Sequence, residues 1–126
     1  MDGYLMNDAI LVFTSVGSEQ QAITIAYELV NLQLAACINI IPDIRSIYRY
    51  KGKVCDDSEF FLIIKTSSDL FDEVAAEISR LHTYEIPEII AVKSENCKDN
   101  FLNWLNRNVR SRNLVNPVTE NVAGTE

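Results

Sequence analysis

The sequence predicts an α+β domain built on an antiparallel sheet, and three observations lead to this class. Short apolar runs typical of strands alternate with segments in which apolar residues recur at helical spacing. These segments follow in the order strand, helix, strand, strand, helix, strand. The 126 residues, 48% hydrophobic and 23% charged, suffice for one core and differ from disordered chains in composition. We therefore expect a single domain spanning residues 1–126, with its core at about residues 9–110.

The first strand and the first helix are expected at residues 9–16 and 19–34. Residues 9–16 are apolar, partly β-branched and bounded by Gly17. Ser18 and Gln21 have the spacing of a capping box, in which each side chain bonds to the backbone N–H of the other residue. Apolar residues then recur at helical spacing up to residue 34, which predicts an amphipathic helix.

A long hairpin is expected from about residue 36 to residue 66. Residues 37–41 are apolar, and an extended pattern resumes after Pro42. Since proline cannot donate to a strand ladder, Pro42 predicts a bulge or bend within one long strand. The return strand is apolar at five consecutive positions, from Phe60 to Ile64, so both of its faces must be covered.

The second half of the chain predicts a helix, a strand and a shorter helix. Asp69 offers an N-cap, and the apolar stripe that follows it ends at His82. Residues 86–92 form the expected fourth strand, and an apolar stripe over residues 101–109 predicts the third helix. Residues 111–126 show no sustained period, and we expect them to be a flexible tail.

This order of elements is the split βαβ, or ferredoxin-like, pattern, in which both helices cover one face of the sheet. Residues 60–64 and 89–92 lack the alternation of a solvated face, so another copy of the chain is expected to cover the open face. The hairpin arms also exceed the usual strand of about 5 to 6 residues, and pairing between copies would protect their edges. Composition alone does not give the number of copies.

Charge and cysteine content exclude several classes of protein. The 18 acidic and 11 basic residues give a net charge of -7, which repels phosphate backbones and anionic lipids. We expect no nucleic-acid partner and no membrane partner, because there is also no run of 18 or more apolar residues and no secretory signal pattern at the start. The three cysteines form no close pair and suit free thiols, so a cytoplasmic location is expected.

No catalytic constellation emerges from the sequence. The chain has one histidine and four glycines, and it contains neither a Gly-x-Ser-x-Gly motif nor a glycine-rich phosphate loop. We therefore expect that this protein is not an enzyme.

Cys37 and His82 are the candidate metal ligands. Thiolate and imidazole groups favour copper or zinc over magnesium, so copper(II) or another divalent cation is the expected ligand, although none is obligatory. The alternative for Cys37 is a small buried hydrophobic residue, and the alternative for His82 is an imidazolium at a helix C-terminus. Cys55 and Cys97 are weaker candidates.

Glu88 stands among isoleucines, and a carboxylate on a buried strand needs a partner. Lys65, at the end of another apolar strand, is expected to form an ion pair with Glu88. The alternative is a pocket for a small anion or metabolite, made by Glu88 and Lys65 with Tyr48, Glu59 and Tyr84.

Five phrases in register together resemble the CutA divalent-cation tolerance family. They are Leu34-Ala35-Ala36-Cys37-Ile38-Asn39, residues 46–53 (Ser-Ile-Tyr-Arg-Tyr-Lys-Gly-Lys), Ile64-Lys65-Thr66, residues 82–89 (His-Thr-Tyr-Glu-Ile-Pro-Glu-Ile) and Phe101-Leu102-Asn103-Trp104-Leu105. The resemblance spans about residues 10–110. It implies a ferredoxin-like subunit, a homotrimer with strand pairing between subunits, and a pocket between subunits near the residues named above.

The same resemblance implies a link to tolerance of copper and other divalent ions and, in animal relatives, an association with membrane-anchored acetylcholinesterase. Tyr50 stands where the family usually has Trp, and Phe101 stands where it often has Tyr. An indole donor and a phenolic hydroxyl are therefore missing here.

Three functions are consistent with the sequence. The first is a trimeric protein that binds copper or a similar divalent cation and contributes to metal-ion homeostasis. The second is a small-molecule sensor or signalling trimer like the PII proteins. The third is a structural partner that aids the maturation or anchoring of another protein.

Overall fold

The computed structural model describes residues 7–110, so the tail predicted at residues 111–126 lies outside the described residues. The helices and strands are β1 (Ala9–Val16), α1 (Glu19–Asn31), β2 (Cys37–Tyr50), β3 (Lys53–Ser67), a 3-10 turn η1 (Ser68–Leu70), α2 (Phe71–Leu81), β4 (Ile90–Lys93) and α3 (Asp99–Arg107). The four strands form one sheet in the order β2-β3-β1-β4, and every neighbouring pair is antiparallel. The predicted α+β class with an antiparallel sheet is confirmed.

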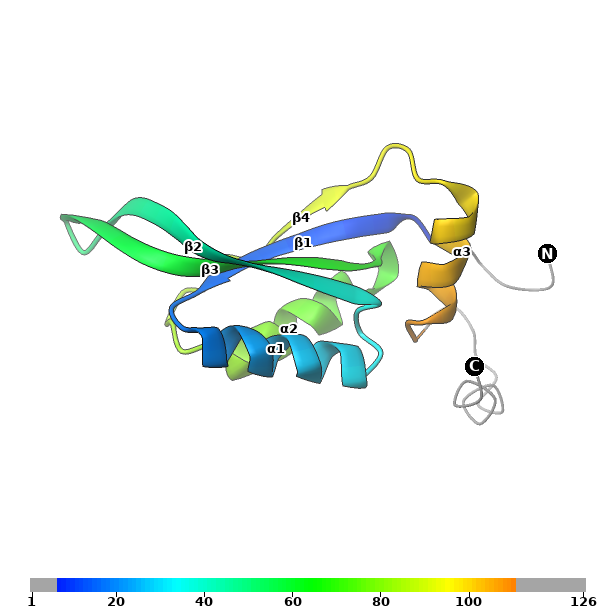
Figure 1. The fold of residues 1–126 in the computed structure, drawn as a ribbon, viewed down its shortest axis with the longest axis horizontal. Helices are drawn as coiled ribbons and strands as arrows, with labels where there is room; N and C mark the ends of the chain where they lie inside the picture. The colour runs from blue at the N-terminus through cyan, green and yellow to red at the C-terminus, as the bar shows by residue number, and fades with distance from the viewer. Residues whose placement is uncertain (1–6, 111–126) are drawn as a thin grey trace.

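The two longer helices lie on one side of the sheet, and α3 lies at the end where β2 begins (Figure 1). Side chains that alternate along the strands face these helices and are fully buried, among them Val12, Leu62 and Ile64. Ile25 of α1 and Ile78 of α2 complete this layer. The core therefore occupies the space between the sheet and the two helices.

The other side of the sheet, here called the open face, carries no helix (Figure 1). Because side chains alternate between faces and directly paired residues share a face, the pairing places a set of apolar side chains on it. They are Leu11, Phe13, Phe61, Ile63, Ile90 and Val92. The rings of Phe13 and Phe61 pack together with centroids 5.4 Å apart, while Ile90 and Val92 are 52% and 42% exposed. The expected apolar open face is thus present.

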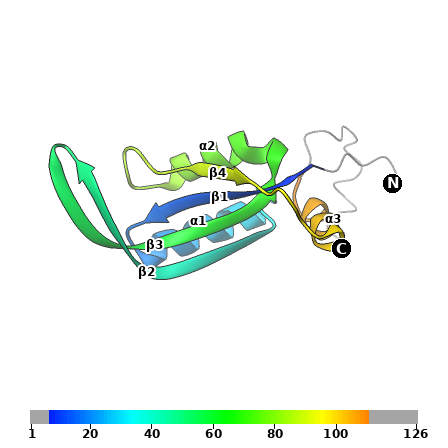
Figure 2. The same ribbon diagram turned by 90° about the horizontal axis from the view of Figure 1, so that it is seen from above.

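The β2–β3 hairpin extends well past the other strands (Figures 1 and 2). Strand β1 ends at the pair Val16 and Phe60, so residues 44–50 and 53–59 pair with each other alone among the described strands. We call these two segments the projecting arm. The guanidinium of Arg45 donates two hydrogen bonds to the Asp56 carboxylate across the arm, at 2.9 and 2.8 Å.

Two backbone features shape this hairpin. The pairing register shifts between Ile41 and Ile44, and Asp43 has a φ of 58°, so the bulge predicted at Pro42 is confirmed. At the tip, Lys51 and Gly52 have φ values of 51° and 78°, which is the pattern of a two-residue type I′ turn. A turn of this type matches the twist of the strands and lets them continue to the tip.

Helix α1 ends three residues earlier than predicted. Gln33 has a φ of 58°, and the N–H groups of Leu34 and Ala35 both bond to the carbonyl of Leu29. This tight turn tucks Leu34 into the core, which explains why an apolar residue stands at that position outside the helix.

The capping box predicted at Ser18 and Gln21 is only half formed. The hydroxyl of Ser18 accepts a hydrogen bond from the Gln21 N–H, as predicted. The Gln21 amide instead donates to the Leu81 carbonyl and accepts from the Thr83 N–H. Gln21 therefore ties α1 to the segment that follows α2.

Candidate functional site

A cavity of about 930 Å³ lies on the open-face side of the sheet, where the projecting arm leaves β1. One wall comes from the arm and the other from the loop of residues 83–88, with Ser15 between them. The residues that line it are Ser15, Ser46, Ile47, Tyr48, Arg49, Tyr50, Glu59, Thr83, Tyr84, Glu85, Ile86 and Glu88. It therefore brings together four of the five predicted pocket residues, namely Tyr48, Glu59, Tyr84 and Glu88.

Two phenol–carboxylate hydrogen bonds lie at the cavity, one between the loop and the arm and the other within the arm. The Tyr84 Oη donates to Glu59 Oε2, and the Tyr48 Oη donates to Asp57 Oδ2. The oxygen–oxygen distance is 2.5 Å in each bond. Burial and the bond to Glu59 raise the pKa of the Tyr84 phenol well above its ordinary value. The hydrogen bond to Asp57 is the main cause that raises the pKa of Tyr48 to about 12. Both phenols therefore hold their protons firmly at neutral pH.

Glu59 is the most buried carboxylate of the site. Its side chain is on the arm, yet the residue is only 5% exposed, and the hydroxyl of Tyr84 bonds to its carboxylate. Within residues 7–110, no Lys, Arg or His forms an ion pair with Glu59, and the Tyr84 phenol is its hydrogen-bond partner. The cavity thus contains a buried carboxylate that forms no ion pair with a cation of residues 7–110.

The ion pair predicted between Lys65 and Glu88 is wrong. Glu88 lies in an exposed loop, where its Oε1 accepts a hydrogen bond from the Ser15 hydroxyl at 3.2 Å. Ser15 pairs with Phe61, so Lys65 lies four residues farther along β3, about 13 Å away at strand spacing. That distance exceeds the reach of the two side chains, and Lys65 does not line the cavity.

The fourth strand is also shorter than predicted, since β4 begins at Ile90 and residues 86–89 belong to the loop. Pro87 lacks the N–H that a ladder requires, and the bond from Ser15 to Glu88 holds this stretch against the end of β1. Ile86 is 79% exposed at the cavity, while Ile89 packs against the core. Ile86 and Ile89, which suggested a strand, thus lie in two different environments, the cavity and the core.

His82 fixes the position of the loop. The backbone N–H of Tyr84 donates to His82 Nδ1 at 3.0 Å, so Nδ1 carries a lone pair. His82 Nε2 lies 2.9 Å from the Ser15 carbonyl oxygen and must therefore carry the ring proton and donate it. Both ring nitrogens are engaged, and the ring contacts β1 instead of capping the carbonyls of α2.

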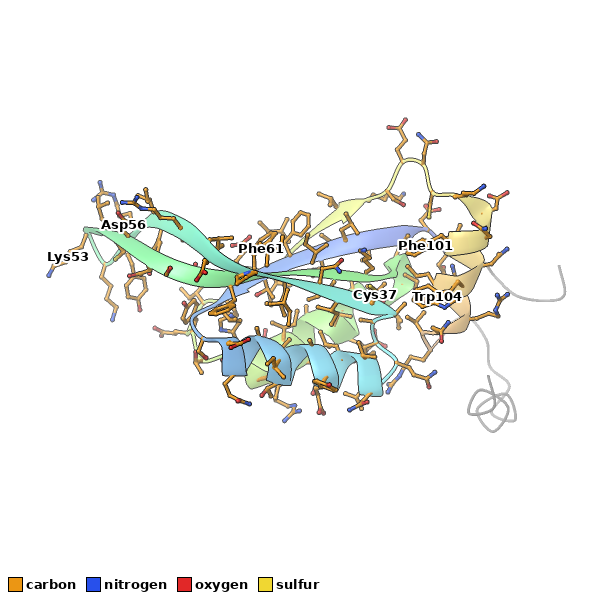
Figure 3. The ribbon with its side chains drawn as sticks, viewed as in Figure 1. Cys37, Lys53, Asp56, Phe61, Phe101 and Trp104 are labelled. Atoms are coloured by element: carbon orange, nitrogen blue, oxygen red, sulfur yellow. The ribbon has the colours of Figure 1, made fainter. Side chains whose placement is uncertain are left out.

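Cys37 and His82 lie far apart within the chain. Cys37 begins β2 opposite Lys65, at the end of the sheet near α3 (Figure 3), whereas the His82 ring bonds to Ser15 two strands away. At the usual strand spacings the two side chains are separated by roughly 16 Å. No group of three or more His, Cys, Asp or Glu side chains within residues 7–110 is arranged to hold a metal ion. The other candidate thiols, Cys55 and Cys97, are half-buried like Cys37 and are not part of a disulfide.

Sequence reasoning missed Ser15, which lines the cavity, and Asp57, which does not line it but bonds to a residue that does. Each is a direct partner of a predicted pocket residue. The alternation of the arm carried a signal for Asp57, because Tyr48, Asp57 and Glu59 share one face of the hairpin in the observed register. Ser15 could be found only once the loop of residues 83–88 was placed against β1.

Comparison with known proteins gives a consistent result. The model of the CutA1 divalent ion tolerance protein family matches residues 10–108. Over 103 residues, 82% of this chain, the sequence is 40% identical to a divalent-cation tolerance protein CutA of Thermus thermophilus, of which it covers 98%. It is 37% identical to a chloroplastic CutA protein of Arabidopsis thaliana, of which it covers 57%. The chain thus spans little more than half of this plant relative.

The solved structures agree with the sequence relationship. The crystal structure of CutA1 from Oryza sativa superposes with a TM-score of 0.82 at 34% identity, covering 84% of this chain and 97% of that one. The helices at residues 7–110 lack the length and apolar character that crossing a membrane requires. On the match of the family model and these relatives, the chain is a member of the CutA1 divalent ion tolerance protein family.

Proposed function

We propose that the chain acts as a non-catalytic homotrimer that binds divalent cations, copper among them, and thereby contributes to metal tolerance. The family description supports this role, since it concerns tolerance to ions and names no reaction. The three free cysteines support a reducing, cytoplasmic location.

The apolar open face is the observation that carries the proposed assembly. Phe13, Phe61 and Val92 share this face, and no helix of the described chain covers it. A face of this kind is buried in most proteins, and a copy of the same chain is the simplest cover. Within residues 7–110, no further strand pairs with the edge of β2 or with the outer edge of the projecting arm, so strands of neighbouring copies can pair there.

The ferredoxin-like subunit belongs to the same proposal. The strand order β2-β3-β1-β4, with α1 and α2 on one face, supports it. The number three comes from the resemblance to the family.

Light scattering tests the assembly with a matched pair of variants. Val92→Glu places a charge on the open face, and Ile23→Glu places the same charge on the outer side of α1, where Ile23 is 37% exposed. We expect the parent and Ile23→Glu to have a particle mass three times that of one chain, and Val92→Glu to have a lower mass. A parent that is a folded monomer at micromolar concentration would contradict the proposal.

The cation is proposed to bind where copies of the chain meet. The described residues contain no complete ligand set within one chain, so a site of three or more donors needs contributions from several copies. Cys37 remains the first candidate because its free thiol stands at the start of the edge strand β2, where copies of the chain are proposed to meet. His82 can contribute only if its ring leaves the hydrogen bonds to Ser15 and Tyr84.

Calorimetric titration with copper(II), combined with metal analysis of untagged protein, tests this part. We expect the parent to bind copper with a stoichiometry that relates to the trimer, and Cys37→Ser to lower the affinity or the stoichiometry. Cys97→Ser, another half-buried thiol, is the matched control. Unchanged isotherms for Cys37→Ser and His82→Ala would remove both residues from the metal site.

A second candidate function is a small-molecule sensor, and the cavity favours it. Its volume of about 930 Å³ lies within the range of small-molecule sites, and it combines aromatic walls with a few convergent polar groups. Thermal-shift screening of the trimer tests this function: a ligand that raises the melting temperature of the parent but not of Glu59→Gln supports it. The absence of any such ligand would favour metal handling alone.

A further inference from the structure

We propose that residues 111–126 fold back over α1 and cover an apolar stripe on its outer surface. The stripe consists of Ile23, Tyr27 and Val30, and its occupant is this named segment of the same chain. The inference is independent of the proposed cation site and of the cavity.

The stripe is an exposed row of apolar side chains. Ile23, Tyr27 and Val30 are 37%, 69% and 42% exposed. Spaced by four and three residues along α1, they share one face of the helix. At about 100° per residue, this face is turned by roughly 100° or more from the buried Leu29 and from Glu28, whose carboxylate forms an ion pair with α2. The stripe therefore lies on neither the core side nor the α2 side of the helix.

The stripe is not part of the open face. Helix α1 lies on the opposite side of the sheet, so a copy that covers the open face does not reach the outer side of α1 (Figure 1). A single exposed apolar residue is ordinary, but a row of three on one helix marks a surface to which another segment binds.

The described chain ends beside this stripe. Val109 is buried in the hydrophobic core. The backbone N–H of Arg110 donates to the Gln33 carbonyl at 2.8 Å, and its side-chain Nε donates to the Leu32 carbonyl at 3.0 Å. Leu32 is the C-cap of α1, two residues beyond the last residue of the stripe. Residues 111–126 therefore start at the end of the helix that carries the stripe.

The segment beyond Arg110 has apolar side chains within reach of the stripe. Its larger ones are Leu114, Val115, Val118 and Val122. At about 3.3 Å per extended residue, Leu114 reaches up to about 13 Å from Arg110, and Val118 up to about 26 Å. With a rise of about 1.5 Å per residue, the stripe lies between about 3 and 14 Å from Leu32 along the helix. The segment is thus long enough to cover the whole stripe.

Tethering favours this segment over a separate partner. A segment attached at the end of α1 meets the stripe at an effective concentration on the order of millimolar, which exceeds that of most free proteins. Pro117 cannot continue a helix, and it biases Asn116 toward an extended backbone. An extended course along α1 uses both properties and shields the stripe from association with other molecules.

Cleavage of the full-length protein by a glutamate-specific protease tests the docking. Glu120 stands between Val118 and Val122, so a docked segment would keep the peptide bond after Glu120 out of the protease. A synthetic peptide of residues 111–126 gives the cleavage rate of the free segment. We expect cleavage at Glu120 to be at least fivefold slower in the parent than in this peptide.

Two matched variants locate the protection. Tyr27→Lys places a charge in the centre of the stripe, and Ser79→Lys places the same charge on an exposed position of α2. Tyr27→Lys should bring the cleavage rate close to that of the peptide, whereas Ser79→Lys should keep the parental rate. If Tyr27→Lys does not keep the circular dichroism spectrum of the parent, Val30→Lys takes its place.

A photo-crosslink identifies the occupant. With p-benzoylphenylalanine in place of Tyr27, irradiation should join the stripe to residues 113–118, and mass spectrometry of the digested product locates the joined peptide. A crosslink within one chain keeps the mass of one chain on a denaturing gel, and a crosslink between chains doubles it.

Three results would each overturn the proposal. The first is a parent cleaved at Glu120 as fast as the peptide. The second is a parental cleavage rate in Tyr27→Lys and Val30→Lys, because the protection would then arise elsewhere. The third is a crosslink that is missing or that joins anything other than residues 111–126 of the same chain. Copper binding and the mass of the trimer do not enter this test, so the proposed function is judged separately.

Discussion

The phenol of Tyr84 donates a hydrogen bond to the carboxylate of Glu59, and this single contact joins the loop after α2 to the projecting arm. The two residues are 25 positions apart in sequence and lie on opposite walls of the cavity. The arm has no residue in the hydrophobic core cluster of the described chain, so contacts such as this one hold it in place.

Removing the phenolic hydroxyl of Tyr84 should destabilise the protein. We expect Tyr84→Phe to lower the free energy of unfolding by about 1 kcal/mol, because Glu59 loses its hydrogen-bond partner. The loss is limited to this size because Tyr84 is partly exposed and solvent weakens the interaction. Denaturant unfolding measures the change. Tyr27→Phe makes the same substitution on α1 at a 69% exposed position and should change stability by less than about 0.5 kcal/mol. Equal effects of the two variants would show that the bond contributes nothing.

Gly17 makes room for the same phenol. A Cβ atom at Gly17 would lie 3.2 Å from Tyr84 Oη, so Gly17→Ala should push the hydroxyl away and weaken its bond to Glu59. A double-mutant cycle measures this coupling. We expect Gly17→Ala to be less favourable in the parent than in Tyr84→Phe, with a coupling energy of about 0.5 to 1 kcal/mol. Additive effects would mean that the added methyl group and the hydroxyl do not interact.

Stability should decline at alkaline pH because of Tyr48 and Tyr84. Hydrogen bonding to Asp57 raises the pKa of Tyr48 to about 12, and burial raises that of Tyr84. Below the unfolded value of about 10 both phenols are protonated in both states, and their contribution is complete. Above it the unfolded chain loses these protons first, so the free energy of unfolding should fall until the folded phenols titrate.

Unfolding curves at several pH values from 8 to 12 measure this decline, and phenolate absorbance follows the titration directly. Tyr84→Phe should show a smaller loss of stability across the same pH range. A free energy of unfolding that stays constant between about pH 10 and 12 would contradict the assignment.

His82 should act as a positioning residue for the loop. In His82→Ala the Tyr84 N–H loses its acceptor, and we expect its hydrogen exchange to accelerate at least tenfold. The neighbouring Thr83 N–H bonds to Gln21 and should change much less. Gln21→Ala should produce the reverse pattern. Equal acceleration of both amides in His82→Ala would indicate general unfolding instead of a specific role for the ring.

The sequence was most informative where a local rule and the tertiary contacts agree. The run over residues 9–16 is apolar because β1 is one of the two inner strands of the sheet, and its predicted bounds match the structure. The bulge at Pro42 follows from the missing N–H of proline, which no tertiary contact can restore. The need of a carboxylate for a partner and the family resemblance together grouped four residues that do line one cavity, namely Tyr48, Glu59, Tyr84 and Glu88.

The errors arose where register and loop placement decide the outcome. Lys65 and Glu88 have opposite charges, but their distance depends on the pairing of β3 with β1, which composition does not reveal. The Gln21 side chain is close to two alternative partners, its own helix N-terminus and the segment after α2, and it bonds to the second. Cys37 and His82 share a chemical preference for soft metals, but that preference says nothing about their separation across the sheet.

The projecting arm gives half of the cavity to a part of the chain with little support of its own (Figure 2). Anything that fills the space between the arm and the loop also acts as a brace, since it contacts both walls at once. A filled cavity would therefore restrain the base of the arm, whose two strands continue to the tip at Lys51 and Gly52.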